Sequence, residues 1–474
     1  MPSSSPLSRA SLALLYACAT LSAWWVGPDG PVYWDSFGYV IQSITGRVGG
    51  LMLGRPTFVL SSHALVVAWR ALGGGLYAVE PLLRCTWMLV SGLGAPALAC
   101  VAIGAGLSTR VAFASGALLA LSPAVAHSSR AVLTDAPSMA VTLVAFGLAL
   151  RATRRGSIAA MFSAGVVLGL AAGLREQAVL HLVTFAALAL VAPRRRIALG
   201  LAGVGGCFVA LGLPVVWLVF HQRSYLATLG DWVRSMAVER AHHPRGWRDL
   251  AMYLVWSLAS GPVALVAASA ALSRSGRVLV ARDSRVLALV VPSALQFVAL
   301  AAYQDIAFSP RYLLAALPCA VMLPAGIVLD ARWPQASVRR ALFAATVGLV
   351  LGAGIAMRAI ERPLRSAVRD LPRRLRAVPA TAAVVTGQLC PAVVYYRELG
   401  RLEGGEFAPS WVQVCPGWRW PPNLATRLDA LRASGHTVVI DLRDAAWVGD
   451  RQRSAREDAA RYALAHGGEV TIWR

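Results

Sequence analysis

The stretch VYWDSFGYVIQSITGRVGGLMLGRPTFVLSSHALVVAWR (residues 32–70) directly follows the first strongly apolar segment of the chain. One acidic residue in this stretch, Asp35, has four aromatic residues close to it in sequence: Tyr33, Trp34, Phe37 and Tyr39. A carboxylate kept at a membrane surface is costly unless it has a function. We therefore interpret Asp35 as a candidate general base, whose pKa a partly desolvated setting would raise. The alternative is a helix-capping aspartate, with Ser36 beside it.

The composition is that of a membrane protein. Of 474 residues, 57% are hydrophobic and 14% are charged, and the mean hydropathy is +0.59. These values exclude a large soluble enzyme and indicate a polytopic membrane protein in contact with lipid. The net charge of +22 does not indicate a nucleic-acid partner, because the arginines form short clusters between apolar runs and so orient helices.

Apolar segments long enough to span a bilayer recur along residues 1–358, which we predict to be a mainly α, transmembrane bundle of about eleven helices. The first segment, Ala10–Val26, resembles a signal peptide but ends in Trp24-Trp25, so we expect an uncleaved helix. The other predicted spans are 83–104, 109–125, 133–150, 157–174, 177–192, 197–220, 251–272, 286–303, 312–330 and 341–358.

Arginine placement predicts the orientation. With the N terminus in the cytoplasm, every cytoplasmic loop is basic, as the positive-inside rule expects. The loop residues are Arg110; Arg151, Arg154 and Arg155; Arg194–Arg196; Arg274, Arg277, Arg282 and Arg285; and Arg332, Arg339 and Arg340. The same topology gathers the remaining polar segments on the outer face, including the loop 221–250, and we expect a bacterial inner membrane.

The tail has a different pattern. Residues 359–378 are predicted to be a basic linker helix lying at the membrane interface. Residues 379–474 alternate short strands and helices, which indicates a small extracytoplasmic α/β domain of three layers. The predicted strands are Ala382–Thr386, Trp411–Cys415, His436–Leu442 and Glu469–Trp473, and the predicted helices are Pro391–Leu399, Pro422–Ser434 and Arg453–His466.

Two of the seven cysteines lie in this tail, and each precedes a proline. An oxidising compartment would favour a disulfide between Cys390 and Cys415. Two free thiols are the alternative, expected if the tail is cytoplasmic. No cysteine spacing matches a metal or redox motif.

Charged residues in three outer turns are the other candidates for chemistry. Arg130 and Asp135 flank the start of one span, where Asp135 could also cap a helix that has Pro137 in its first turn. In the turn GLREQ, Arg175 could clamp a phosphate with Glu176 or Gln177 positioning it, or form a local ion pair. Arginine suits phosphate because its planar fork binds two oxygens at once.

The turn SPRYLLAALP adds Arg311 and Tyr312 at the start of a further span. Arg311 could hold a phosphate leaving group, or only extend its charge to the interface. The adjacent His242 and His243 lie in a polar loop and are not expected to bind metal.

Together these motifs resemble the GT-C superfamily of membrane glycosyltransferases, particularly the branch with protein O-mannosyltransferases and bacterial aminoarabinose transferases. The resemblance covers residues 1 to about 330. The motifs that carry it are WDSFGYV (34–40), GRP (54–56), SRAVLTDAP (129–137), GLREQ (173–177) and SPRYLLAALP (309–318).

The resemblance implies an inverting enzyme that moves a sugar from a polyprenyl-phosphate-sugar donor to a lipid, glycan or protein acceptor at the outer face. It implies catalytic acids at Asp35 and Asp135. The implied donor-phosphate ligands are Arg175, Arg311 and Arg130, and the implied site-shaping residues are Tyr39, Arg55, Glu176, Gln177 and Tyr312.

Two departures limit what is carried over. Many members have an Asp-Glu pair where this chain has Asp35-Ser36, so the sequence does not support a divalent metal, although one is possible, and it predicts no certain cofactor. Many have a His-Pro-Pro motif where this chain has Arg55-Pro56, which leaves the acceptor open.

A transporter or flippase of lipid-linked sugars is the alternative function, but such a protein is expected to have charges at helix centres and paired repeats. A non-catalytic scaffold would leave the charged outer turns unexplained.

Overall fold

The structure is a computed structural model. It describes residues 7–27, 34–49, 53–241, 283–303, 310–332, 369–386, 390–403, 407, 410–414, 423–442, 450–467 and 470–473, with scattered positions between 341 and 359. Contacts divide the chain into two compact units. We name them the transmembrane unit (Met1–Gly27, Gly46–Ser62 and Arg84–Ala356) and the tail unit (Pro28–Thr45, His63–Leu83 and Met357–Arg474).

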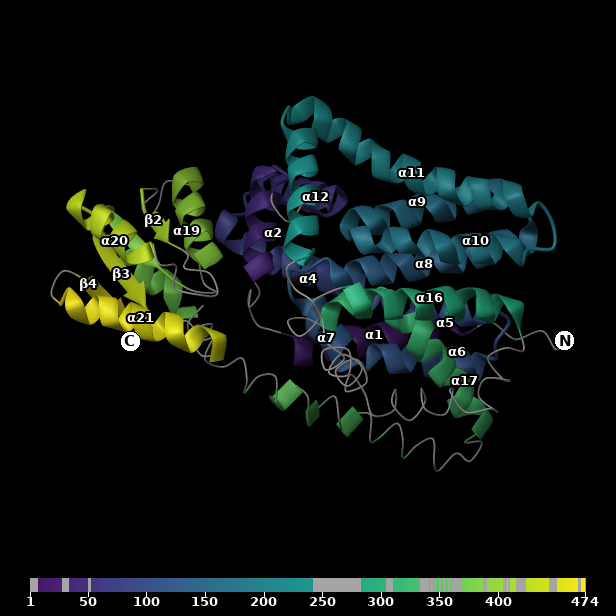
Figure 1. The fold of residues 1–474 in the computed structure, drawn as a ribbon. Helices are drawn as coiled ribbons and strands as arrows, with labels where there is room; N and C mark the ends of the chain where they lie inside the picture. The colour runs from purple at the N-terminus through teal and green to yellow at the C-terminus, as the bar shows by residue number, and fades with distance from the viewer. Residues whose placement is uncertain are drawn as a thin grey trace. The chain divides into compact units, whose positions relative to one another are not determined.

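The transmembrane unit is helical, which confirms the predicted fold class (Figure 1). Its elements are α1 (Arg9–Val26), α5 (Gly94–Gly104), α6 (Thr109–Ala120), α7 (Pro123–Arg130), α8 (Asp135–Arg155), α9 (Ile158–Leu174), η3 (Glu176–His181), α10 (Leu182–Leu190), α11 (Arg196–His221), α12 (Tyr225–Ala241), α16 (Ser284–Tyr303), η4 (Pro310–Leu313), η5 (Pro318–Met322) and α17 (Leu323–Arg332). Two further helices, α3 (Pro56–Ala71) and α4 (Val79–Gly92), contribute residues to both units.

Several of these helices are long and apolar enough to cross a bilayer. Among the described residues, the runs Leu76–Gly104, Asp135–Arg155 and Arg196–His221 meet that test, and α6 with α7 meets it as a pair bent by 56°. Shorter apolar helices occupy four more of the predicted spans, at Ile158–Leu174, Glu176–Leu190, Ser284–Leu300 and Pro318–Ile327. The chain is thus a multi-pass membrane protein. The predicted count of eleven is not confirmed, and the predicted span 251–272 lies outside the described residues.

Small residues bring α9 and α11 into close contact. A Cβ atom on Gly165 would collide with the carbonyl group of Gly203, and one on Gly206 would collide with that of Phe162. Lipid tails are as apolar as leucine, so helices in a bilayer associate through close packing of this kind rather than through the hydrophobic effect. The pair therefore forms a rigid wall on which the turn after α9 is built.

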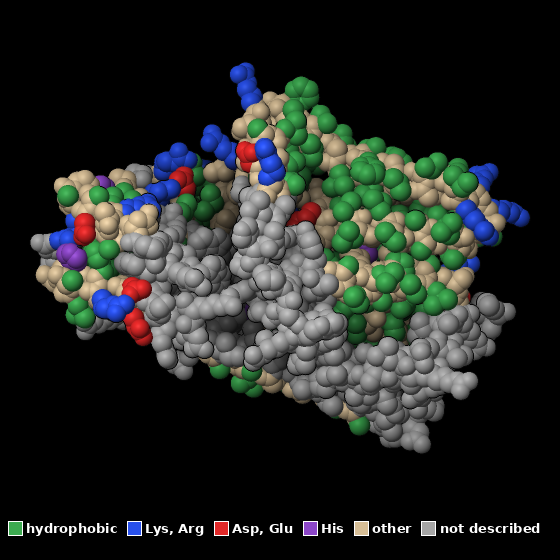
Figure 2. Space-filling view, in the orientation of Figure 1, with side chains coloured by type: hydrophobic (Ala, Val, Ile, Leu, Met, Phe, Trp, Pro, Cys, Tyr) green, Lys and Arg blue, Asp and Glu red, His purple; other side chains and the backbone are tan. Residues whose placement is uncertain are grey.

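The outer surface of α10 and α11 is apolar. Figure 2 shows hydrophobic side chains over this face, and the exposed ones include Val183, Leu190, Ile197, Leu201, Phe208, Leu213 and Phe220. A contiguous apolar face of this size is normal for a surface in contact with lipid. Basic side chains gather at the turn between the two helices, where Arg194, Arg195 and Arg196 are exposed.

The segment 221–250 corrects one expectation. It was predicted to be a loop, but its described part contains the helix α12 (Tyr225–Ala241). The Tyr225 hydroxyl donates to the carbonyl oxygen of Leu53 at 2.8 Å, and the Gln222 amide donates to that of Val48 at 2.8 Å. These bonds hold the start of α12 to the chain segment that leads into Arg55.

The tail unit contains the predicted small sheet, and all its described strand pairs are parallel, a direction that the sequence analysis did not predict. Its strands are β1 (Ala382–Val385), β2 (Val412–Val414), β3 (Thr437–Asp441) and β4 (Val470–Trp473), in the order β2-β1-β3-β4. The predicted helices are also present, as α19 (Cys390–Glu403), α20 (Leu424–Ala433) and α21 (Asp450–Ala465). Side chains from α20 and α21 cover one face of the sheet. All of β1 is buried, so both faces are covered, as expected of a parallel sheet.

Candidate functional site

Buried charges from three separate segments meet in the transmembrane unit. An oxygen of Asp135 (Oδ1) lies 3.3 Å from Nη2 of Arg175, and the other oxygen (Oδ2) lies 3.9 Å from Nε of Arg311. All three side chains are less than 10% exposed. Charges are rarely kept in such surroundings without a counter-charge or a function. The structure thus brings together three of the residues that the sequence singled out.

The local sequence explains where each of the three lies. Asp135 is the first residue of α8, where a negative charge interacts favourably with the helix dipole. Arg175 ends α9 with an extended backbone (φ −148°, ψ 117°), so its side chain leaves the helix at the turn into η3. Arg311 follows Pro310 in the short helix η4. Helix ends therefore supply all three charges.

A second carboxylate extends this cluster. Glu176 forms a two-point interaction with Arg55, at 3.0 Å from Nε and 3.4 Å from Nη2, and lies 4.0 Å from Nε of Arg175. We call Arg55, Asp135, Arg175, Glu176 and Arg311 the charge cluster. The described charges in it are three positive and two negative, so together they carry one net positive charge. Such a group is suited to an anionic ligand.

Glu176 belongs to the turn ahead of the predicted span 177–192. Burial raises the pKa of its carboxyl group, but the charges of Arg55 and Arg175, the hydrogen bond from Arg55 and a backbone hydrogen bond outweigh this effect and lower it to about 2. Glu176 is therefore ionised at every physiological pH. The pair with Arg55 joins segments 121 residues apart, and no sequence signal pointed to it.

The turn that carries Arg175 and Glu176 is held in place from several sides. The Gln296 amide of α16 donates to the carbonyl oxygen of Gln177 at 3.3 Å, and Nε2 of His181 donates to that of Ala315 at 3.0 Å. Thr57 approaches Gly173 so closely that a Cβ atom there would collide with it. These contacts fix the backbone, so the arginine can keep one orientation before a ligand binds.

Arg130 lies at another place in the same unit. Its Nη1 atom donates to the carbonyl oxygens of Trp24 at 2.7 Å and Gly27 at 3.4 Å, and its guanidinium group lies 4.1 Å from the centre of the Trp24 ring. Free carbonyls at the end of a helix favour a cation. Arg130 therefore caps the C-terminal end of α1, and its predicted role in phosphate binding stays a prediction.

Other predicted residues lie in the tail unit or have undescribed side chains. Asp35 is the second residue of α2 (Trp34–Thr45) in the tail unit, but its side chain, like that of Tyr312, is not among those described. Tyr39 is fully buried. Cys390 is disulfide-bonded. Its predicted partner Cys415 lies outside the described residues, so that pairing stays a prediction.

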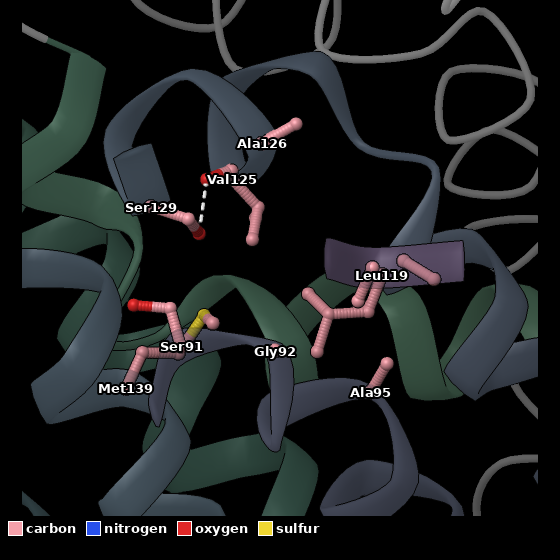
Figure 3. A pocket seen from close by; sticks show the side chains of 10 residues that line it. Ser91, Gly92, Ala95, Leu119, Val125, Ala126, Ser129 and Met139 are labelled. Atoms are coloured by element: carbon pink, nitrogen blue, oxygen red, sulfur yellow. Dashed lines mark hydrogen bonds between the residues drawn. The ribbon is translucent and has the colours of Figure 1, made fainter. Parts of the chain in front are cut away.

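A small pocket in the transmembrane unit does not add reactive groups. Figure 3 shows its lining, which is mostly apolar and includes Leu119, Val125 and Met139. Its two hydroxyl groups bond within their own helices: Ser129 donates to Val125, and Ser91 donates to Trp87, each at 2.7 Å. Across the described residues, no three His, Cys, Asp or Glu side chains form a potential metal site.

Comparisons with known proteins agree with this architecture. A family model described as dolichyl-phosphate-mannose-protein mannosyltransferase matches residues 83–220, less than a third of the chain. That match spans Asp135, Arg175 and Glu176. No curated protein matches the chain significantly in sequence.

Two solved structures share the fold. ArnT from Cupriavidus metallidurans, bound to undecaprenyl phosphate, aligns over 98% of this chain and 90% of its own length, with 13% identity and a TM-score of 0.57. The chain therefore shares the fold of ArnT. The archaeal oligosaccharyltransferase AglB from Archaeoglobus fulgidus, in complex with an inhibitory peptide and a dolichol-phosphate, aligns over 81% of this chain with 13% identity and a TM-score of 0.50. The aligned part of the chain spans 63% of the length of AglB.

Proposed function

We propose that the protein is a membrane glycosyltransferase, which transfers a sugar from a polyprenyl-phosphate-sugar donor to a lipid, glycan or protein acceptor. The reaction takes place at the outer face of a bacterial inner membrane, with the N terminus in the cytoplasm. One observation carries the proposal: Arg175 and Arg311 meet at Asp135 inside an apolar helix bundle. ArnT and AglB, which share the fold at low identity, were solved with bound polyprenyl phosphates.

The charge cluster binds the donor phosphate in this proposal. Guanidinium groups donate to phosphate oxygens in pairs, and they do so most strongly where water is excluded. Asp135 and Glu176 do not contact the phosphate. They hold Arg175, Arg311 and Arg55 at fixed positions, so that the positive charge is already arranged before the donor binds.

The transfer itself is an in-line displacement. A hydroxyl or amine of the acceptor attacks C1 of the sugar, and its new bond to C1 forms as the bond from C1 to the phosphate oxygen breaks. The attacking group gives its proton to the carboxylate of Asp35, acting as general base. The polyprenyl phosphate leaves with the bonding electrons, its charge stabilised by the arginines. The sugar is delivered with inverted configuration.

The test separates chemistry from donor binding. Membranes containing the parent protein or Asp35→Asn receive undecaprenyl-phosphate donors with radiolabelled sugars, and the label is followed into lipid, glycan and protein fractions. The general base is expected to account for about a 10³-fold rate effect, while undecaprenyl-phosphate binding changes less than about twofold. Asp231→Asn is the control, because Asp231 is exposed and pairs only with the neighbouring Arg234 among described contacts. Full transfer by Asp35→Asn would contradict the role of Asp35.

A further inference from the structure

The helix that contains Asp35 packs against the C-terminal part of the chain, within the tail unit. The Phe37 ring of α2 lies 5.9 Å from the ring of Tyr395 in α19, centre to centre. Both rings are buried. Aromatic rings at this distance are in direct contact and resist sliding past each other. Phe37 is two residues from Asp35, so this contact restrains the first turn of α2.

The last residue of α19 contacts the short helix that precedes α4. A carboxylate oxygen of Glu403, the last residue of α19, accepts a hydrogen bond from the backbone N–H of Leu76 at 2.7 Å. Leu76 begins η2 (Leu76–Ala78), the first turn of the membrane-length run Leu76–Gly104. A carboxylate at a helix N-terminus satisfies a free N–H group and interacts favourably with the helix dipole.

A chain of rings joins these contacts to the sheet. Starting from Tyr395, centre-to-centre distances are 5.1 Å to Tyr396, 4.9 Å from Tyr396 to Phe407, and 6.0 Å from Phe407 to Trp411. The indole nitrogen of Trp411 then donates to the carbonyl oxygen of Pro379 at 3.0 Å, close to the start of β1. Tyr77 lies 6.1 Å from Phe407 and joins the same cluster. The aromatic residues that begin with Tyr395 therefore connect α2 to the segment that leads into the sheet of the tail unit.

The other end of α2 is held by α3. Nδ1 of His63 donates to the carbonyl oxygen of Ser43 at 2.8 Å. Between the two ends, Phe37, Tyr39 and Val40 are buried. The helix is thus fixed at its first turn by α19 and at its last turn by α3. Two separate anchors define its direction, which a single contact would leave free to rotate.

We infer that the C-terminal domain positions the catalytic helix: α19 contacts α2 through Tyr395 and is itself attached to η2 through Glu403, and it so sets the place of the helical turn that carries Asp35. The inference rests on the proposed function, because it gives the tail a role in that reaction. Tyr395 is a positioning residue and contacts no reacting atom.

Amide hydrogen exchange of the full-length protein tests the contact without reference to activity. Tyr395→Ala removes the ring under Phe37, and the amides of residues 36–45 are expected to exchange about tenfold faster. Tyr462→Ala is the matched control, since Tyr462 is a buried tyrosine in α21 of the same domain that packs with α20 and the sheet. Unchanged exchange of α2 in Tyr395→Ala would overturn the inference.

Kinetics tests the consequence for Asp35. Tyr395→Ala is expected to lower kcat about tenfold with little change in the KM for the donor, while Tyr395→Phe keeps the ring and is expected to restore the parent rate. Faster exchange of α2 with an unchanged kcat would overturn the positioning role. Asp35→Asn separates a failure of the proposed function from a failure of the positioning role. If this variant remains fully active, the proposed function fails, whatever the exchange result.

A milder variant guards against misfolding. Glu403→Gln keeps the size of the side chain but removes the charge at the first turn before α4. Exchange at Leu76–Ala78 is expected to rise severalfold. If Tyr395→Ala does not accumulate as folded protein, the kcat of Glu403→Gln tests whether α19 positions α2. It falls if α19 has this role and stays at the parent value if it does not.

Discussion

The two units position their candidate functional residues by different interactions, ion pairs in one and aromatic contacts in the other. In the transmembrane unit, Arg175 and Arg311 are oriented by the carboxylate of Asp135, so charge positions charge among apolar helices. In the tail unit, α2 is oriented largely by aromatic rings, with Phe37 on Tyr395. The difference teaches what each arrangement is for. Aromatic rings can fix a helix without ions, so buried ions in an apolar bundle call for a separate explanation, and the proposed function gives one in the binding of an anionic phosphate.

The largest effect is expected from removing the central negative charge. Asp135→Asn leaves Arg175 and Arg311 without their shared counter-ion, and breaking a buried ion pair on one side costs about 3–5 kcal/mol. The variant is expected to unfold at a clearly lower temperature than the parent in detergent, and to bind undecaprenyl phosphate poorly because the arginines are no longer held.

Asp231→Asn is the control for this change. Asp231 pairs with Arg234 on the exposed side of α12, where an ion pair contributes about 0–1 kcal/mol. The two variants remove the same charge and differ in burial. If they melted at the same temperature, the contrast between the buried cluster and the surface would be wrong.

A smaller, pH-dependent effect is expected at Glu176, whose side chain is 37% exposed. Its pKa is lowered to about 2 in the folded protein, so the ionised carboxylate stabilises the fold above the unfolded value of about 4.5, and this contribution is lost as the pH falls towards 2. Glu176→Gln should therefore cost about 1 kcal/mol at pH 7, given partial solvent screening.

Melting curves at pH 7, 5 and 3 check this prediction. The gap between the parent and Glu176→Gln should be constant from pH 7 to pH 5 and shrink at pH 3. A gap that widened on acidification would mean that Glu176 gains, rather than loses, its stabilising effect when protonated, and would remove it from the charge cluster.

Much of the fold could be predicted because its signals are local. Short runs such as Ala382–Thr386 alternate with helical segments in the tail, and they gave the strands to within a residue or two of β1 (Ala382–Val385). Among the described residues, hydropathy located apolar helices at several predicted spans but not the bends within them. The 56° break between α6 and α7 depends on backbone direction, which hydropathy does not record, although Pro123 at the start of α7 was the available signal.

The residues of the charge cluster could be predicted from the sequence, but most of the contacts between them could not. Asp135, Arg175 and Arg311 stood out because charges at the ends of apolar segments are uncommon. The pairing of Arg55 with Glu176 joins residues 121 positions apart, and the contact of α2 with α19 joins the two ends of the chain. Such contacts depend on tertiary packing, and no pattern within either segment encodes them. The helix α12 was missed because its sequence has no clear apolar face.

The most direct test of the central claim is the binding of undecaprenyl phosphate to purified protein carrying Arg175→Gln, Arg311→Gln or Arg154→Gln. Arg154 lies in the last turn of α8, about 30 Å along the helix from Asp135, and serves as the matched control. Losing one charged hydrogen-bond donor is expected to weaken binding about 10- to 100-fold for Arg175→Gln and Arg311→Gln, and to leave Arg154→Gln near the parent value. Equal affinity for all three variants would contradict the claim that the charge cluster binds the donor phosphate.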